Sequence, residues 1–338
     1  MTVEAGTVRA FAPGRVNLIG DHTDYTGGLV LPMAVSLGTT VALAPGGEAV
    51  RLTSGAEAGE AMVPLAVTDP ATVEPAWARY VAGVVSVLRP AVGGTGTVTT
   101  TLPVGAGLSS SAALELAVAL ALGFDGTPLE LAQACQEAEQ RASGVPCGIM
   151  DQLASAAGVA GHALLIDCTT LEIEPVPVPE DVEVVVANSG QARTLAGSAY
   201  AERRAQCEAA AETVGPLRDA TPEDVARIGD PVLRARARHV VSENARVREV
   251  AAALRSGDLH MAGELMTASH VSLRDDFEVS TEALNHLVGK LAFTPGVYGA
   301  RLTGAGFGGC VVALAEPGAA LPVEAWRLRP GPGASRDG

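Results

Sequence analysis

Residues 103–114 read PVGAGLSSSAAL, and a run of Ala, Leu and Val continues from there to Leu122. Gly105 and Gly107 lack a Cβ atom, so this backbone can adopt positive φ and lie close to a ligand. Three consecutive serines then supply natural N-cap and first-turn residues. The pattern predicts a helix whose N-terminal N–H groups and positive dipole end face the glycine loop, an arrangement that binds phosphate. The alternative is a tight turn that only caps a buried helix.

A second glycine loop lies almost two hundred residues further on, where residues 302–310 read LTGAGFGGC. Its glycines match G-x-G-x-x-G, but a dinucleotide-binding loop opens a helix and is followed by an acidic residue about 20 positions later. Here residues 311–314 are apolar and indicate a buried strand. Neither loop is followed by Gly-Lys-Ser/Thr, so neither is a Walker loop. A tight hairpin is the alternative explanation of the second loop.

The segment from residue 14 to residue 28 carries Arg15, Asp21, His22 and Asp24 between apolar stretches. A guanidinium, an imidazole and two carboxylates in one loop suit a polyhydroxyl ligand, because each hydroxyl needs a donor or an acceptor. His22 alone would more often be a core histidine, but here it stands between two aspartates.

Asp151 lies in an apolar context in the stretch CGIMDQ, residues 147–152. A carboxylate there must be paired, and Arg15 is a candidate partner. The alternative is a purely structural ion pair, because such networks also perturb ionisation.

The composition agrees with an enzyme of small molecules. A chain of 338 residues is long enough for two domains with cores. The net charge of −15 argues against nucleic acid and anionic membranes as partners. Five cysteines without paired metal spacing, and no signal peptide or membrane-spanning apolar run, indicate reduced thiols and a cytoplasmic location. Lys290 is the only lysine, so Arg15 and backbone N–H groups are left to bind phosphate.

Apolar periodicity predicts an α+β chain. A proline-rich stretch at residues 175–179 is the best boundary, so we expect domains at 1–178 and 179–338. Residues 330–338 are expected to be a floppy tail. The predicted strands are 8–12, 29–34, 39–43, 50–53, 97–102, 163–167, 172–178, 182–186, 299–303 and 311–314, and the predicted helices are 77–88, 111–122, 128–142, 199–213, 230–256, 259–275 and 280–290.

With these motifs the chain resembles the galactokinases of the GHMP small-molecule kinase superfamily. The three superfamily signatures match residues 14–25, 103–114 and 302–310, and further matches lie at 136–139, 147–152, 188–189, 200–208 and 269–276. The resemblance implies the two-domain GHMP kinase fold, with an N-terminal half like ribosomal protein S5 domain 2, a ferredoxin-like C-terminal half and the site between them. Galactokinases usually carry Glu where this chain has Asp21, which leaves the exact sugar open.

The resemblance implies an ATP-dependent kinase that phosphorylates the C1 hydroxyl of galactose to galactose 1-phosphate, as in Leloir galactose metabolism. Its cofactors would be ATP and Mg²⁺, its partners only the sugar and ATP, without nucleic acid or membrane, and we expect a monomer. The alternatives are a sibling kinase acting on N-acetylgalactosamine, arabinose or a uronic acid, and a non-catalytic sensor of galactose and ATP.

The resemblance also assigns roles to individual residues. Asp151 and Arg15 match the catalytic pair. The positions that match sugar contacts are Asp21, His22, Asp24, Gly148 and Tyr200. Those that match ATP contacts are the phosphate-loop residues Gly105, Ala106, Gly107, Leu108, Ser109, Ser110 and Ser111, with Trp77 and Tyr80 near adenine. The magnesium ligands are matched by Ser110, Ser111 and Glu139.

Overall fold

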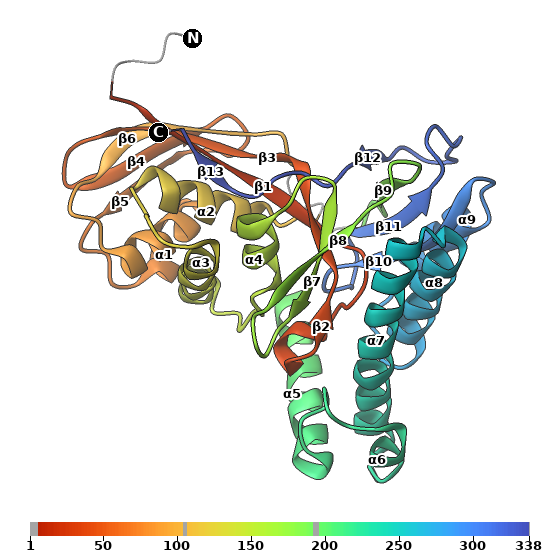
Figure 1. Cartoon of the computed structure of the whole chain (residues 1–338). Coiled ribbons are helices and arrows are strands. Elements are labelled where there is room, and N and C mark those ends of the chain that lie inside the picture. Colours follow the sequence, from red (N-terminus) through yellow and green to blue (C-terminus); the bar gives the residue numbers. More distant parts are fainter. Residues whose placement is uncertain (1–5, 104–106, 192–195, 338) are drawn as a thin grey trace.

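The computed structural model describes residues 6–103, 107–191 and 196–337. Its first part is a six-stranded sheet with the strand order β13-β1-β3-β6-β4-β5, in which only β4 and β6 run parallel (Figure 1). Four helices pack below this sheet. The strands are β1 (Val8–Asn17), β3 (Pro32–Pro45), β4 (Ala49–Ser54), β5 (Glu60–Pro64), β6 (Gly94–Thr100) and β13 (Ser335–Arg336), and the helices are α1 (Ala78–Leu88), α2 (Ser110–Ala121), α3 (Pro128–Ser143) and α4 (Met150–Ala157).

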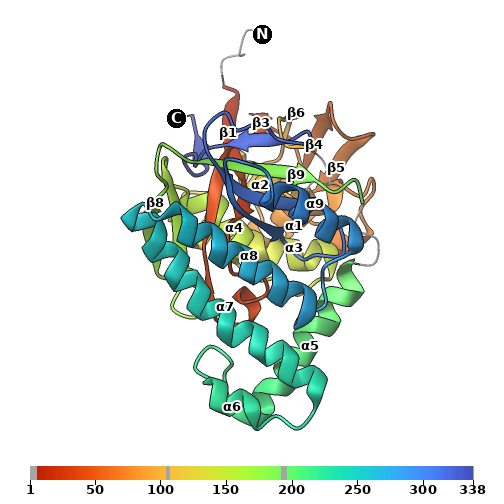
Figure 2. The same ribbon diagram turned by 90° about the vertical axis from the view of Figure 1, so that its right-hand side faces the viewer.

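The second part is a four-stranded antiparallel sheet with the order β10-β11-β9-β12. Figure 2 shows α7 and α8 side by side on the outer side of this sheet. A small third sheet, β2-β7-β8, lies next to the first. The remaining elements are β2 (Leu29–Val30), β7 (His162–Asp167), β8 (Ile173–Pro177), β9 (Glu183–Asn188), β10 (Val297–Thr303), β11 (Cys310–Ala315), β12 (Trp326–Leu328), α5 (Ala196–Val214), α6 (Pro222–Ala226), α7 (Pro231–Ser256), α8 (Leu259–Asp275), α9 (Glu282–Ala292) and the short 3₁₀ helices η1 (Asp24–Thr26) and η2 (Pro70–Thr72).

Both faces of β9 and β11 are buried, which explains why these strands are continuously apolar. Successive side chains of a strand point to opposite faces. In β9, Val184 and Val186 therefore join the core under the first sheet, whereas Val185 and Ala187 join the core under α7, α8 and α9. One sheet thus separates two cores, and it holds both parts of the chain together.

Helix α3 has clear start and stop signals, and it carries Glu139. The hydroxyl of Thr127 accepts a hydrogen bond from the Glu130 N–H at 3.2 Å, while the Glu130 carboxylate accepts one from the Thr127 N–H at 2.8 Å. This reciprocal pair is a capping box, followed by Pro128 at the first helical position. The helix ends at Gly144, which has the left-handed φ of 70° common after a last turn.

Most predicted elements are present within a few residues of their expected bounds, and the chain has the predicted α+β architecture. Several predictions of local structure were wrong. The strand β1 continues to Asn17, so Arg15 lies on a strand and not in a loop. The strands predicted at 29–34 and 39–43 are instead a two-residue β2 and a single 14-residue β3. The elements β5, α4, α6 and β12 were missed.

The expected floppy tail is also an ordered part of the fold. The N–H of Gly331 donates to Ala34 O at 2.9 Å, and that of Gly333 donates to Gly158 O at 2.7 Å. Residues 335–336 then pair with β1 as the edge strand β13, so the C-terminus lies beside the first sheet (Figure 1). Backbone donors of this glycine-rich segment find acceptors on β3 and near α4, an interaction that composition does not reveal.

Among the described residues, no helix combines the length and apolar character needed to cross a bilayer.

Candidate active site

Arg15 and Asp151, which are 136 positions apart, form a bidentate pair. Arg15 Nε donates to Asp151 Oδ1 at 2.7 Å, and Nη2 donates to Oδ2 at 2.6 Å. The third nitrogen, Nη1, donates to the carbonyl of Gly107 at 2.8 Å. The predicted pairing of Arg15 with Asp151 is therefore confirmed. Strand β1 contributes the arginine and the first turn of α4 the carboxylate, and the pair reaches the edge of the phosphate-sized loop.

Ser109 begins α2, but its hydroxyl does not cap the helix. Its backbone has a left-handed φ of 57°, and its side chain donates to Asp151 Oδ2. Asp151 thus receives three donors from two distant parts of the chain. Leu108 contributes backbone only, because its side chain is in the core and its carbonyl accepts from the Arg15 N–H at 3.1 Å. The predicted loop residues Gly105 and Ala106 lie outside the described residues.

A cavity of about 380 Å³ brings together the predicted catalytic and sugar-binding residues. Side chains from β1, the following loop, α3, α4 and α5 meet there, and the second glycine loop closes one side. The residues that line the cavity include Arg15, Asp21, His22, Asp24, Tyr80, Glu139, Gly148, Asp151, Tyr200, Gly304 and Ala305.

A second cavity of about 280 Å³ holds the predicted adenine and serine contacts. Trp77 and Tyr80 line it together with Ser110 and Ser111. Tyr80 lines both cavities, so the two adjoin. The indole N–H of Trp77 donates to the Ala58 carbonyl at 3.2 Å, which fixes the ring at the cavity wall.

Glu139 lies on α3 at the border of the two cavities. Its Oε1 accepts from the Ser111 hydroxyl at 3.1 Å, and its Oε2 accepts from the amide of Gln152. Burial, and secondarily the charge of Asp151, raise the pKa of Glu139 to about 7. Gln152 and the fully buried Glu115 behind it were not predicted as site residues. Within the described ranges, no cluster of three or more His, Cys, Asp or Glu side chains forms a protein-only metal site.

His22 is a neutral, oriented imidazole in the sugar-sized cavity. Burial lowers its pKa to about 3. Its Nε2 lies 3.2 Å from the carbonyl of Ala305, which can only accept, so Nε2 carries the proton. Nδ1 then accepts from the Tyr25 hydroxyl at 2.9 Å. The ring also lies 5.6 Å from that of Tyr200, centroid to centroid.

Asp24 and Gly148 meet at very close range. A Cβ atom built on Gly148 would lie 1.9 Å from Asp24 Oδ2, so only glycine leaves room for this carboxylate. Burial, and then the charge of Asp151, raise the pKa of Asp24 to about 7. The cavity therefore holds two carboxyl groups whose pKa is raised to about 7, those of Asp24 and Glu139, beside the paired Asp151.

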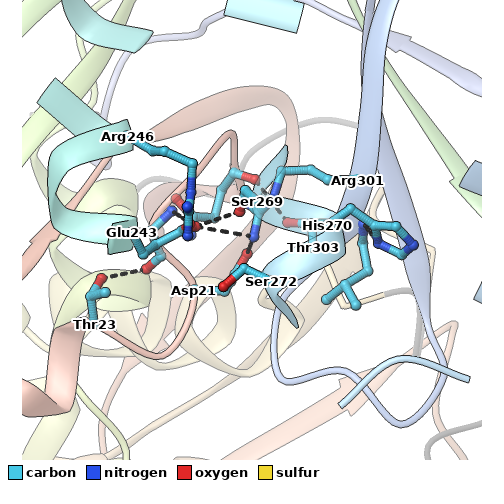
Figure 3. Close-up of polar contacts among 12 residues, drawn as sticks. Asp21, Thr23, Glu243, Arg246, Ser269, His270, Ser272, Arg301 and Thr303 are labelled. Carbon is cyan, nitrogen blue, oxygen red and sulfur yellow. Dashed lines mark hydrogen bonds and ion pairs between the residues drawn. The ribbon is translucent and has the colours of Figure 1, made fainter. Parts of the chain in front are cut away.

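Asp21 is almost completely buried, and both oxygens of its carboxylate have protein partners. Its Oδ1 accepts from the Gly304 N–H at 3.0 Å, and Oδ2 lies 2.7 Å from Arg301 Nη2 (Figure 3). Arg301 pairs in turn with Glu243 on α7. Sequence reasoning missed Arg301 and Glu243. The one available signal was an arginine among apolar residues of a buried strand, which requires a buried counter-charge.

Comparisons with known proteins agree with this site. The galactokinase galactose-binding signature matches residues 3–45, the GHMP kinases N terminal domain matches 79–159, and the GHMP kinases C terminal domain matches 250–325. The fold is shared with a mevalonate kinase at a TM-score of 0.69 and 18% identity, over 96% of this chain and 98% of that one. Fold and site together define a GHMP kinase.

Whole-chain relatives narrow the class. A galactokinase of Homo sapiens is 46% identical over 91% of this chain and 84% of its own length. One from Roseiflexus sp. (strain RS-1) is 46% identical over 90% and 82%. The crystal structure of Lactococcus lactis galactokinase complexed with galactose superposes with a TM-score of 0.90 and 34% identity, covering 98% of this chain and 95% of that one. The chain belongs to the galactokinase family.

Proposed function

We propose that this enzyme transfers the γ-phosphoryl group of ATP to the C1 hydroxyl of galactose and forms galactose 1-phosphate and ADP. The observation that supports this proposal most strongly is the Arg15–Asp151 pair. The pair faces the cavity lined by His22, Asp24 and Tyr200. It also contacts Gly107 and Ser109 at the phosphate-sized loop. The sugar oxygen forms a bond to the γ-phosphorus, and the bond from this phosphorus to the β–γ bridging oxygen breaks. The bridging oxygen keeps the electron pair and leaves as part of ADP, and the hydroxyl proton passes to water.

Asp151 is proposed to orient the attacking hydroxyl. Three donors occupy part of its acceptor capacity, namely two N–H groups of Arg15 and the Ser109 hydroxyl. A carboxylate has about four lone-pair directions, so one remains for the sugar hydroxyl. Arg15 lies between Asp151 and the loop carbonyl, where its charge also stabilises the transferring phosphoryl group. Positioning and charge neutralisation of this kind account for most phosphoryl-transfer catalysis.

Sugar recognition is proposed for Asp21, His22, Asp24, Gly148 and Tyr200. The two carboxyl groups supply acceptors, and the tyrosine hydroxyl supplies a donor or an acceptor. A cavity built to hydrogen-bond a particular hydroxyl rejects sugars that lack it, because its buried polar groups would be left unpaired.

ATP is proposed to bind with adenine near Trp77 and Tyr80 and its phosphates at Gly107 to Ser111, where the N-terminus of α2 favours negative charge. Ser110, Ser111 and Glu139 are proposed to hold Mg²⁺. These residues fit the ion, since they present only oxygen ligands and Mg²⁺ is usually bound through one or two carboxylates plus substrate phosphates. Bound Mg²⁺ would neutralise the charge of the β- and γ-phosphates.

The domain division at residue 178 and the cytoplasmic location remain proposals. The smaller core supports the division, since all its buried residues lie after residue 178, whereas the larger core draws on both halves of the chain. The five cysteines are thiols and not disulfides in the described structure, which supports a reducing compartment.

A sugar panel tests the proposal. The purified chain is incubated with Mg²⁺ and ATP plus galactose, glucose, N-acetylgalactosamine, arabinose or a uronic acid, and ADP release is measured. Galactose is expected to give the highest kcat/KM. A higher value for another sugar would identify a sibling kinase. Binding of galactose and ATP without ADP release from any sugar would identify a sensor.

A further inference from the structure

A completely buried arginine lies behind the sugar cavity. Arg301 is on β10, where the neighbouring Ala300 and Leu302 point into the core under α7, α8 and α9. Because side chains alternate along a strand, Arg301 and Thr303 face the opposite side. There Arg301 Nη1 donates to Leu18 O at 3.1 Å, and Thr303 Oγ1 donates to Asn17 O at 2.9 Å. Strand β10 is therefore docked against the chain just before Asp21.

Arg301 lies between two buried carboxylates, as Figure 3 shows. Its Nη2 is 2.7 Å from Asp21 Oδ2 and 3.7 Å from Glu243 Oε1. Other donors fix Glu243 in place. Ser269 Oγ donates to its Oε1 at 2.5 Å, the Gly20 N–H donates to the same oxygen at 3.1 Å, and Arg246 Nε donates to Oε2 at 2.9 Å. The far side of Arg301 thus rests on a carboxylate that cannot move freely.

Several groups contact Asp21. Among the contacts of the described residues, the one with a charged partner is the ion pair with Arg301, at 2.7 Å. His239 Nε2 donates to its backbone carbonyl at 3.1 Å, and the Gly304 N–H donates to Oδ1 at 3.0 Å. Burial raises the pKa of Asp21, and Arg301 is the strongest influence that lowers it again. Arg301 does not line the sugar cavity itself.

We propose that Arg301 is a positioning residue of the sugar site, which keeps the Asp21 carboxylate aimed into the cavity by holding it against Glu243. The inference rests on the proposed function, because it takes Asp21 as a sugar contact. Sugar affinity then depends on Arg301, although the arginine touches no sugar. ATP affinity does not, because Arg301 does not line the cavity of Trp77 and Ser111.

The test compares Arg301→Met with Arg246→Met in the full chain. Both variants remove one cation that pairs with Glu243, but only Arg301 contacts Asp21. Dissociation constants for galactose and for ATP are measured separately by calorimetry, after thermal unfolding has shown that each variant is folded. Arg301→Met is expected to raise the galactose Kd about tenfold or more, because the buried Asp21 carboxylate loses its paired cation, and to leave the ATP Kd within about twofold. Arg246→Met is expected to raise the galactose Kd much less and to leave the ATP Kd unchanged, because Ser269 and the Gly20 N–H still hold the Glu243 oxygen that lies near Arg301.

A double-mutant cycle with Asp21→Asn shows whether Arg301 acts through Asp21. In that background, Arg301→Met is expected to change the galactose Kd much less, since the carboxylate it positions is gone. Arg301→Lys keeps the charge without the planar fork and is expected to restore part of the affinity. If Arg301→Met does not fold, the same dissociation constants are measured for Arg301→Lys and for the double variant Asp21→Asn/Arg301→Met.

A wild-type galactose Kd in a folded Arg301→Met or Arg301→Lys variant would overturn the inference. Additive effects in the cycle, or equal losses for galactose and ATP, would overturn it too. Sugar binding by the wild-type protein distinguishes failure of this inference from failure of the proposed function, because only the latter changes which sugar the wild-type protein binds. If it binds another sugar in place of galactose, the same cycle is run with that sugar.

Discussion

Gly148→Ala is the most selective perturbation that the site offers. The φ of Gly148 is outside the left-handed region, so alanine can adopt the same backbone. The new Cβ, however, would lie 1.9 Å from Asp24 Oδ2 and 2.4 Å from its Cγ. Cβ atoms essentially never approach other heavy atoms within 3.0 Å, so the Asp24 carboxylate must shift by about 1 Å.

A misplacement of about 1 Å at a reacting site lowers the rate about a hundredfold, or about 2.7 kcal/mol of transition-state stabilisation. We therefore expect Gly148→Ala to lower kcat/KM for galactose by about a hundredfold, with ATP binding unchanged. The assay is steady-state kinetics with galactose varied at saturating Mg²⁺ and ATP, beside ATP calorimetry.

Gly289→Ala is the matched control, because Gly289 is on α9, its φ is not left-handed, and nothing lies within 4 Å of its built Cβ. It is expected to leave kcat/KM unchanged. The reasoning is refuted if Gly148→Ala, correctly folded, keeps kcat/KM within about threefold of the wild-type value.

Three further results are expected. Asp151→Asn abolishes turnover, while the ATP Kd measured by calorimetry stays at the wild-type value. If the variant keeps more than about a tenth of the wild-type kcat, a loss of less than about 1.4 kcal/mol in transition-state stabilisation, the role of Asp151 is structural. Glu139→Gln raises the Mg²⁺ concentration for half-maximal rate about tenfold or more, and a wild-type titration would remove Glu139 from the metal site. Because the pKa of Asp24 is raised to about 7, its carboxyl is protonated below that pH and charged above it. Glu139 has a similar pKa in the same cavity, so the test is made in the Glu139→Gln variant. There the galactose Kd without nucleotide falls as the pH rises from about 6 to about 8, because the charged Asp24 carboxylate is the better acceptor, and a slope that survives addition of Asp24→Asn would contradict this assignment.

The parts of the site that local patterns encode could be predicted from sequence. Arg15 and Asp151 are charged residues in apolar surroundings, and a buried charge needs a partner. Arg15 could therefore be predicted as a candidate partner of Asp151, and the structure pairs them. The glycine loop at 304–309 was predicted to connect two antiparallel strands, and β10 and β11 are those strands. What the pattern did not reveal is that this loop faces the sugar cavity.

The contacts that depend on distant packing could not be predicted. Ser109 has the composition of an N-cap, yet its hydroxyl turns to Asp151, because α4 places a carboxylate there. Arg301 and Glu243 are separated from Asp21 by more than two hundred residues. The apolar neighbours of Arg301 indicate that it is buried, but no local pattern shows which carboxylates it meets. The ordered C-terminal segment was missed for the same reason, since its hydrogen-bond acceptors lie on β3 and near α4.

Carbon NMR of [1-¹³C]galactose, incubated with the enzyme, Mg²⁺ and ATP, tests the central claim most directly. If the C1 oxygen receives the phosphoryl group, the C1 resonance shifts and splits into a doublet through coupling to phosphorus, in step with ADP formation. A C1 resonance that stays an unshifted singlet while ADP accumulates would contradict transfer to the C1 hydroxyl.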